Sequence, residues 1–234
     1  MPKIRLNENA IKIIACISMF IDHFAAAFSI GNFPELLLRW VIGRLAFPLF
    51  CFTLVEGFLH TRNLRKYLLR LILAALISEV PFDLVFFHEP FYTGYQNTLF
   101  TLTCGLLLLQ LLQLIREHVR TNSPLPRLLL SAVSIGAFAA AAEFLHFDYG
   151  YSGILCIAAI YIVRTCFIFP LYMAEVWGCF GLNLPYFTLP CAFLAVIPIC
   201  FYTGKRGRRD LKWFFYLFYP CHLLLLFLIR TVFI

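Results

Sequence analysis

Apolar stretches recur along the whole chain and are separated by short polar connections. A membrane helix needs about 20 mostly apolar residues to cross the hydrocarbon core, and most of these stretches come close to that length. The pattern therefore predicts about nine membrane helices, over residues 11–30, 40–59, 67–88, 98–115, 127–146, 151–165, 166–183, 186–203 and 212–233. The stretch 151–183 leaves only about 25 Å for each of two helices, so one of them is expected to be tilted against partners or re-entrant.

The composition supports a membrane protein. Hydrophobic residues make up 62% of the 234 residues and charged residues only 13%, and the mean hydropathy is +0.86. In soluble domains roughly a quarter of the residues are charged. The sequence predicts an all-α polytopic bundle in which residues 1–234 form one membrane domain.

The distribution of basic residues predicts the orientation of this bundle. Lys and Arg gather on the cytoplasmic side of membrane proteins. With nine crossings, an N-terminus inside and a C-terminus outside, all of the 19 basic residues except Arg39, Arg44 and Arg230 fall on the cytoplasmic side. Eight crossings would place the basic segment 204–212 outside, against the rule. We attribute the net charge of +7 to this topology and to the binding of an anionic ligand or lipid, and not to the binding of nucleic acid.

Several ionisable residues fall inside predicted helices, where each is costly unless it is paired. In the predicted orientation Asp22 and His23 share the outer half of the membrane with Arg44, Glu79 and Asp83. The outer connections and the last helix bring further polar side chains to that level, namely Gln96, Asn97, Asp148 and His222. Any one of these residues would suit a structural ion pair or an interhelical hydrogen bond. Their convergence is what predicts a site.

A second polar group is predicted on the opposite side of the membrane. Arg62, Lys66 and Arg70 are spaced four residues apart, which predicts a cationic stripe on the third helix, with Arg65 beside it. One interpretation is that these residues only follow the positive-inside rule and bind no ligand. The other is a phosphate clamp for a nucleotide-bearing ligand, because arginine binds phosphate in a bidentate manner and lysine adds a point charge.

Lys12 and His23 connect the two levels. They are eleven residues apart, which places them on one face of the first helix with a rise of about 16 Å between them. A long, thin ligand with an anionic head and a reactive tip fits this arrangement. The pantetheine arm of an acyl-coenzyme A has about that shape.

Longer runs carry a resemblance to a known family. They are "KIIACISMFIDHF", "RLAFPLFCFTLVEGFLHTRNLRKYLLRL" followed by "ISEVPFDL", "DYGYSGIL" and "KWFFYLFYPCHLLLLFLIR". Together they span nearly the whole chain and resemble the TraX family of polytopic proteins, named for the conjugative pilin acetylase. More distantly, Lys12 and His23 resemble the pattern of a basic residue, ten residues and a histidine in bacterial transmembrane acyltransferases. Arg62 and Arg65 resemble the R-x-x-R element of those enzymes.

The resemblance implies a multi-pass protein of the bacterial inner membrane. The resemblance further implies transfer of an acyl group, usually acetyl, from cytoplasmic acyl-CoA, with acetyl-CoA as the expected donor, to an acceptor at the outer face. In the pilin acetylase the acceptor is the N-terminal amine of a processed pilin, and in the wider superfamily it is commonly a sugar hydroxyl or amine. The expected partners are therefore the acyl-CoA donor, an exported protein or surface glycan, and membrane lipids. The acceptor, the acyl chain length and the oligomeric state stay open.

A mechanism can be written with these parts. Neutral His23 would act as general base on the acceptor, because imidazole exchanges protons near neutral pH and burial favours its uncharged form. An alternative makes His23 a transient acyl carrier. The other predicted roles are phosphate binding by Lys12, Arg62, Arg65 and Lys66; orientation of the ring by Asp22 or Glu79; oxyanion stabilisation by Arg44 with Gln96 or Asn97; and acceptor binding by Asp83, Gln96, Asn97, Asp148 and His222.

Two other functional classes compete with this hypothesis. A small proton-coupled transporter or flippase would use the same acidic residues and histidines as a proton relay, but it needs no cytoplasmic cationic clamp, and the chain shows no inverted repeat of broken helices. A non-catalytic scaffold would leave the converging polar residues unexplained. No metal site is expected, since the nine cysteines are scattered singly without histidines at ligand spacing.

Overall fold

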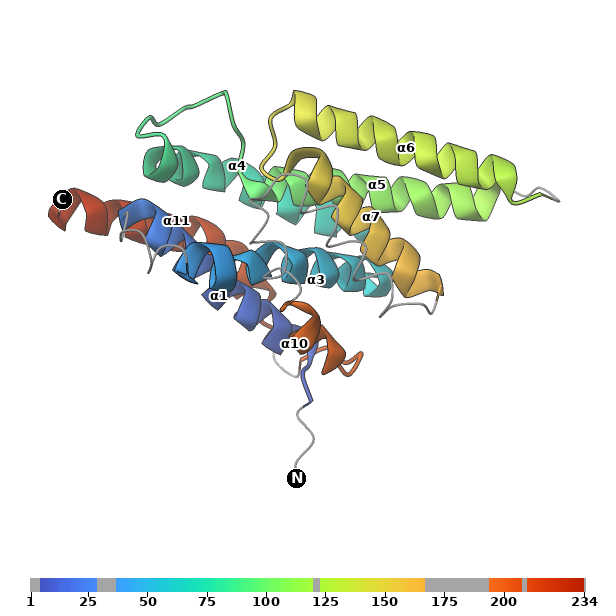
Figure 1. The fold of residues 1–234 in the computed structure, drawn as a ribbon, viewed down its shortest axis with the longest axis horizontal. Coiled ribbons are helices and arrows are strands. Elements are labelled where there is room, and N and C mark those ends of the chain that lie inside the picture. Colours follow the sequence, from blue (N-terminus) through green and yellow to red (C-terminus); the bar gives the residue numbers. More distant parts are fainter. Residues whose placement is uncertain (1–4, 29–36, 120–122, 167–193, 208–209, 234) are drawn as a thin grey trace. The chain divides into compact units, whose positions relative to one another are not determined.

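The computed structural model describes residues 5–28, 37–119, 123–166, 194–207 and 210–233 (Figure 1). Every regular element within these ranges is helical, which confirms the predicted all-α class for this part of the chain. The longer elements are α1 (Glu8–Phe28), α3 (Ala46–His60), α4 (Leu64–Phe86), α5 (Thr98–His118), α6 (Leu125–Phe144), α7 (Gly150–Cys166) and α11 (Lys212–Phe233).

Four of the described helices are long and apolar enough to cross a membrane, namely α1, α5, α6 and α11. In α6 the exposed fractions of Leu128 and Val133 are 66% and 68%. Large apolar side chains exposed along one helix need a lipid or protein environment. The predicted helix 166–183 falls almost entirely outside the described residues, so the nine crossings and their orientation stay predictions.

The chain folds as two compact units, and each is described by itself. The first unit comprises residues 1–53, 76–92 and 181–234. In it α1 packs along α11 and against the turns that precede α3. The start of α1 is tied to the segment before α11, because Leu6 N–H donates to the Phe201 carbonyl and Thr203 N–H donates to the Leu6 carbonyl, both at 2.9 Å.

The second predicted helix differs from the structure at its start. The sequence predicts one helix over 40–59, whereas the chain forms a π-helical turn over Leu38–Ile42 and a 3-10 turn over Gly43–Leu45 before α3 begins at Ala46. The turns lie against α1, where the Ser18 hydroxyl donates to the Ile42 carbonyl at 2.5 Å. This bond satisfies a backbone carbonyl where the regular helical ladder is interrupted.

The predicted helix 186–203 also differs in its described part. Residues 194–203 form only the short helix α10 (Val196–Cys200), after which Tyr202 pairs in parallel with Leu6. The residues before 194 lie outside the described part of the chain.

The second unit comprises residues 54–75 and 93–180, and its helices α5, α6 and α7 pack side by side. Helix α5 begins at a cap, because the Asn97 side chain accepts from Leu99 N–H at 2.9 Å. Gly105 permits a close approach of α7, since a Cβ there would meet Ile157 Cδ1 at 2.3 Å. Buried leucines of α5, among them Leu106 and Leu109, form the core of this unit.

Candidate active site

The site in the first unit centres on two buried imidazole rings. His23 of α1 and His222 of α11 have exposed fractions of 9% and 4%. His23 Nδ1 lies 2.8 Å from His222 Nε2, a hydrogen-bond distance, and the ring planes are only 15° apart. The two histidines are 199 positions apart in sequence, and the packing of α1 on α11 brings them together.

The contacts of His222 assign the protons on both rings. His222 Nδ1 lies 2.8 Å from the Phe218 carbonyl oxygen, which can only accept, so Nδ1 carries the hydrogen. In the neutral ring Nε2 is then an acceptor, and His23 must donate to it from Nδ1. The neutral His23 ring therefore has its lone pair on Nε2. That nitrogen has the character of a general base.

Aromatic side chains surround the pair. The rings of Phe86, from α4, and Tyr219 meet His23 edge to face at centroid distances of 5.3 and 6.0 Å. Phe218 stacks on His222 at 4.9 Å. Such walls exclude water and hold the imidazoles in one orientation.

Asp22 pairs with a cation on the neighbouring turn. Its Oδ1 lies 4.0 Å from Arg39 Nε. The sequence predicted Asp22 as one of two groups that could orient the His23 ring, and the structure places its carboxylate beside Arg39. Gly43 makes room for this carboxylate, because a Cβ at that position would lie 2.5 Å from Asp22 Oδ1.

Three other predicted residues belong to the same unit. Arg44 lies in the 3-10 turn that packs on α1. Glu79 is half-buried in α4. Asp83 is only 1% exposed; its Oδ2 accepts from Tyr92 N–H at 2.9 Å, and Oδ1 is buried without a hydrogen-bond partner among the described residues. Their catalytic and acceptor-binding roles stay predictions.

The predicted phosphate-binding residues lie in both units. Lys12 Nζ, in the first unit, contacts Glu8 Oε1 at 2.5 Å and lies 5.5 Å from the centre of the Phe215 ring. Arg62, Arg65 and Lys66, in the second unit, are exposed. The predicted helical stripe is wrong at one end, because α4 begins at Leu64 and Arg62 therefore lies in the preceding turn.

The other predicted polar residues of the second unit organise a connection. Gln96 pairs with Phe147 through the backbone, where Asp148 N–H donates to the Gln96 carbonyl at 2.9 Å. Asp148 accepts hydrogen bonds from the Tyr95 and Thr98 hydroxyls. The Asn97 amide donates to the Ala75 carbonyl at 2.9 Å. These contacts give Gln96, Asn97 and Asp148 a structural role, and their predicted part in acceptor binding or oxyanion stabilisation stays a prediction.

Sequence reasoning missed two features. Glu56 is 1% exposed inside α3, with its Oε2 4.0 Å from His60 Nδ1, and a lone carboxylate in an apolar run was the available signal. Sequence reasoning also assigned His222 to acceptor binding and not to a contact with His23. No local pattern signals a pairing across 199 positions.

Comparison with known proteins identifies the family. The chain matches the TraX protein family over residues 7–230. The chain belongs to the TraX family. A relative, the probable fimbrial assembly protein FimC of serogroup H1 from Dichelobacter nodosus, is 34% identical, and the match covers 92% of each chain. No solved structure matches this TraX-family chain.

Proposed function

We propose that this TraX-family protein is a membrane-embedded acetyltransferase. It moves an acetyl group from cytoplasmic acetyl-CoA to an amine or hydroxyl of an acceptor at the outer face of the inner membrane. The observation that carries the proposal is the buried His23–His222 pair, because it leaves one imidazole nitrogen with a defined lone pair inside a membrane helix. A scaffold needs no such group.

The reaction follows from ordinary acid–base chemistry. His23 Nε2 takes the proton of the acceptor N–H or O–H as that atom attacks the thioester carbonyl carbon. The tetrahedral intermediate collapses with cleavage of the C–S bond, and the imidazolium returns the proton to the leaving thiolate. The products are the acetylated acceptor and free CoA. His222 keeps His23 in the productive tautomer through the cycle.

Two predicted residues support this cycle. Arg44 lies in the turn packed on α1 and is the proposed donor to the oxyanion, a role worth about 3 kcal/mol for a well-placed donor. Asp83 is proposed to bind the acceptor, since its buried Oδ1 lacks a hydrogen-bond partner among the described residues.

The name of the relative narrows the choice of acceptor. Because the similar protein is named a probable fimbrial assembly protein, we propose a pilin-type protein, through its N-terminal amine, as the first acceptor to test. A surface glycan is the second. Binding of the donor phosphates is assigned to Lys12, Arg62, Arg65 and Lys66, all of which carry positive charge.

The experiment uses inside-out membrane vesicles from cells with and without the gene. Radiolabelled acetyl-CoA is added, and label is followed into pilin and glycan fractions. Gene-dependent label in either fraction supports the proposal, and its absence from both overturns it. Label trapped on the protein itself when acceptor is withheld would favour the acyl-histidine route over direct transfer.

A further inference from the structure

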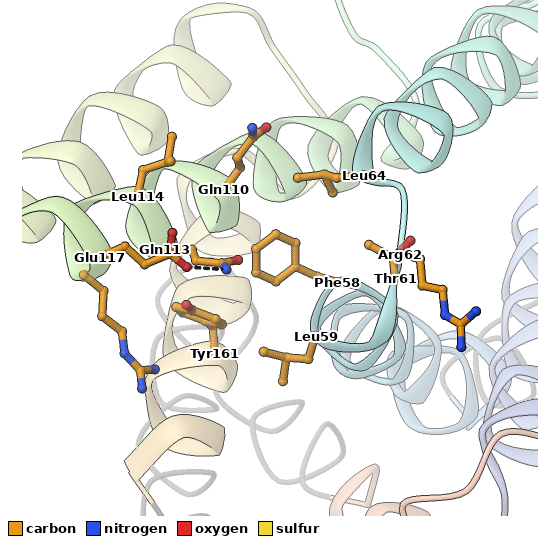
Figure 2. A pocket seen from close by; sticks show the side chains of 11 residues that line it. Phe58, Leu59, Thr61, Arg62, Leu64, Gln110, Gln113, Leu114, Glu117 and Tyr161 are labelled. Atoms are coloured by element: carbon orange, nitrogen blue, oxygen red, sulfur yellow. Dashed lines mark hydrogen bonds between the residues drawn. The ribbon is translucent and has the colours of Figure 1, made fainter.

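A cavity of about 630 Å³ lies in the second unit. It opens where the last turns of α3 and α5 face α7, beside the turn that leads into α4 (Figure 2). Small-molecule sites typically have volumes of roughly 300 to 1,000 Å³. Of its lining residues only Arg62 has a role in the function proposed above.

One wall of the cavity is aromatic. Phe58 and Tyr161 are both buried, with exposed fractions of 5% and 6%, and their ring centroids are 5.9 Å apart with planes at 76°. In Figure 2 the Phe58 ring lies between α3 and α5, and Tyr161 reaches in from α7. Because the two rings are nearly perpendicular, only one of them can present its face to a planar ligand, and such an aromatic face is suited to stacking against a nucleobase.

A second wall carries two carboxamides. Gln110 and Gln113 are three residues apart on α5 and line the same cavity. Gln113 Nε2 donates to Glu117 Oε1 at 2.7 Å, the dashed line in Figure 2. This bond orients the amide and leaves its carbonyl oxygen as an acceptor, while Gln110 offers both a donor and an acceptor. The edge of a purine needs both kinds of group.

Cations complete the lining. Arg62, in the turn before α4, and Arg116, on α5, both line the cavity, together with Glu117. Two guanidinium groups outweigh the single carboxylate. Arginine side chains bind phosphate with paired hydrogen bonds. In the predicted orientation both arginines lie on the cytoplasmic side, where acetyl-CoA is available.

This combination favours a nucleotide over a phospholipid. A lipid headgroup would need the cations and an apolar groove for its chains, but it has no flat ring to use the aromatic wall and the two amides. We propose that the cavity binds the adenine nucleotide end of acyl-CoA, with the base against Phe58, its edge on Gln110 and Gln113, and its phosphates on Arg62 and Arg116. The inference rests on the proposed function and names the donor's binding site.

The test compares two acetyl donors in the vesicle assay. Acetyl-CoA carries the nucleotide, and acetyl-pantetheine lacks it. Arg116→Ala is expected to raise the KM for acetyl-CoA by about 10- to 100-fold, the usual cost of a lost charge-assisted hydrogen bond, with little change in kcat. Its kinetics with acetyl-pantetheine should equal those of the wild type. Arg206→Ala removes an exposed arginine outside the cavity and should leave KM and kcat with both donors unchanged.

A binding measurement provides a readout that does not depend on turnover. Adenosine 3′,5′-bisphosphate is titrated by calorimetry into the purified full-length protein in detergent. The wild type should bind it, and Arg116→Ala and Phe58→Leu should bind it at least about 10-fold more weakly. A thermal melt of each variant checks that it is folded. Phosphatidylglycerol added as a competitor separates the nucleotide from an anionic lipid.

The outcomes separate the two proposals. If the wild type transfers acetyl and Arg116→Ala shows the wild-type KM for both acetyl-CoA and acetyl-pantetheine, the cavity assignment is overturned and the proposed function stays intact. If the wild type binds the bisphosphate, Arg116→Ala does not, and the wild type transfers acetyl from neither donor, the nucleotide site is supported and the proposed function is overturned. Binding of phosphatidylglycerol but not of the bisphosphate overturns the site.

Discussion

At the scale of a single residue, His222 decides which nitrogen of His23 is free to take a proton. His222→Leu removes the acceptor for His23 Nδ1–H, so the ring loses its fixed tautomer and orientation. We expect kcat for acetyl transfer to fall by about 10²-fold or more, with KM for acetyl-CoA near the wild-type value. Kinetics with radiolabelled acetyl-CoA measure both quantities.

His222→Gln is the matched variant. Its side-chain carbonyl can accept from His23 Nδ1–H near the position of the lost Nε2, so it should recover a substantial part of kcat. Equal loss in the Leu and Gln variants would show that His222 only fills space.

Gly43 gives a second prediction at this scale. In Gly43→Ala the new Cβ would lie 2.5 to 2.8 Å from Asp22 Oδ1, Cβ and Cγ, so α1 or the turn must shift. We expect the free energy of unfolding to fall by about 1 to 3 kcal/mol. The control is Gly136→Ala in α6, where a Cβ meets no atom within 4 Å, and it should be neutral or stabilising by up to about 1 kcal/mol. Thermal unfolding in detergent compares the two, and equal midpoints would contradict the close contact.

The sequence pointed to many single residues but not to their partners. His23 and Asp83 stood out because ionisable groups in apolar helices are costly, and both are buried. The His222 contact and the Asn97 cap depend on which helices pack together and on where a helix begins. A charge pattern in one helix carries neither piece of information.

At the scale of elements, Tyr95 and Asp148 join the connection before α5 to the one before α7. The Tyr95 hydroxyl donates to Asp148 Oδ1 at 2.9 Å, and burial, followed by the Asp148 charge, raises the pKa of the Tyr95 phenol above its usual value. Tyr95→Phe should therefore lower the free energy of unfolding by about 1 kcal/mol at neutral pH.

The pH dependence of this difference has a defined sign. A phenol whose pKa is raised in the folded state contributes its full stability below its unfolded pKa of about 10 and loses it as the pH rises through the folded value. The gap between wild type and Tyr95→Phe should stay constant from pH 7 to about 10 and shrink above that. Tyr92→Phe, which keeps a ring stacked on Phe87, is the control. A gap that widens above pH 10 would contradict the assignment.

The sequence predicted the central parts of the long helices better than their ends. Blocks 98–115 and 127–146 correspond closely to α5 and α6, because sustained apolar length is what a bilayer requires. The interruption over 38–45 was missed, because a Ser18 side chain from another helix supplies the hydrogen bond that makes the turn stable there. Hydropathy contains no term for such a contact.

At the scale of the whole molecule, the basic residues predict an N-terminus in the cytoplasm and a C-terminus outside. A fluorescent-protein fusion at the C-terminus should be dark, and an alkaline phosphatase fusion there should be active, because each reporter works on only one side of the inner membrane. The same pair fused after Arg120, on the predicted cytoplasmic side, should give the opposite result. A fluorescent C-terminal fusion would mean either an even number of crossings with the N-terminus inside or an inverted bundle, and either result would contradict the prediction.

The central claim is that His23 is the base for acetyl transfer, and the rate of label transfer from acetyl-CoA in a His23 variant tests it most directly. His23→Gln should lower this rate by about 10²- to 10⁴-fold while the protein stays folded and inserted in the membrane. His118→Gln, an exposed histidine of α5 whose Nδ1 contacts its own helix, should transfer label at the wild-type rate. Transfer by a folded His23→Gln at the wild-type rate would contradict the account.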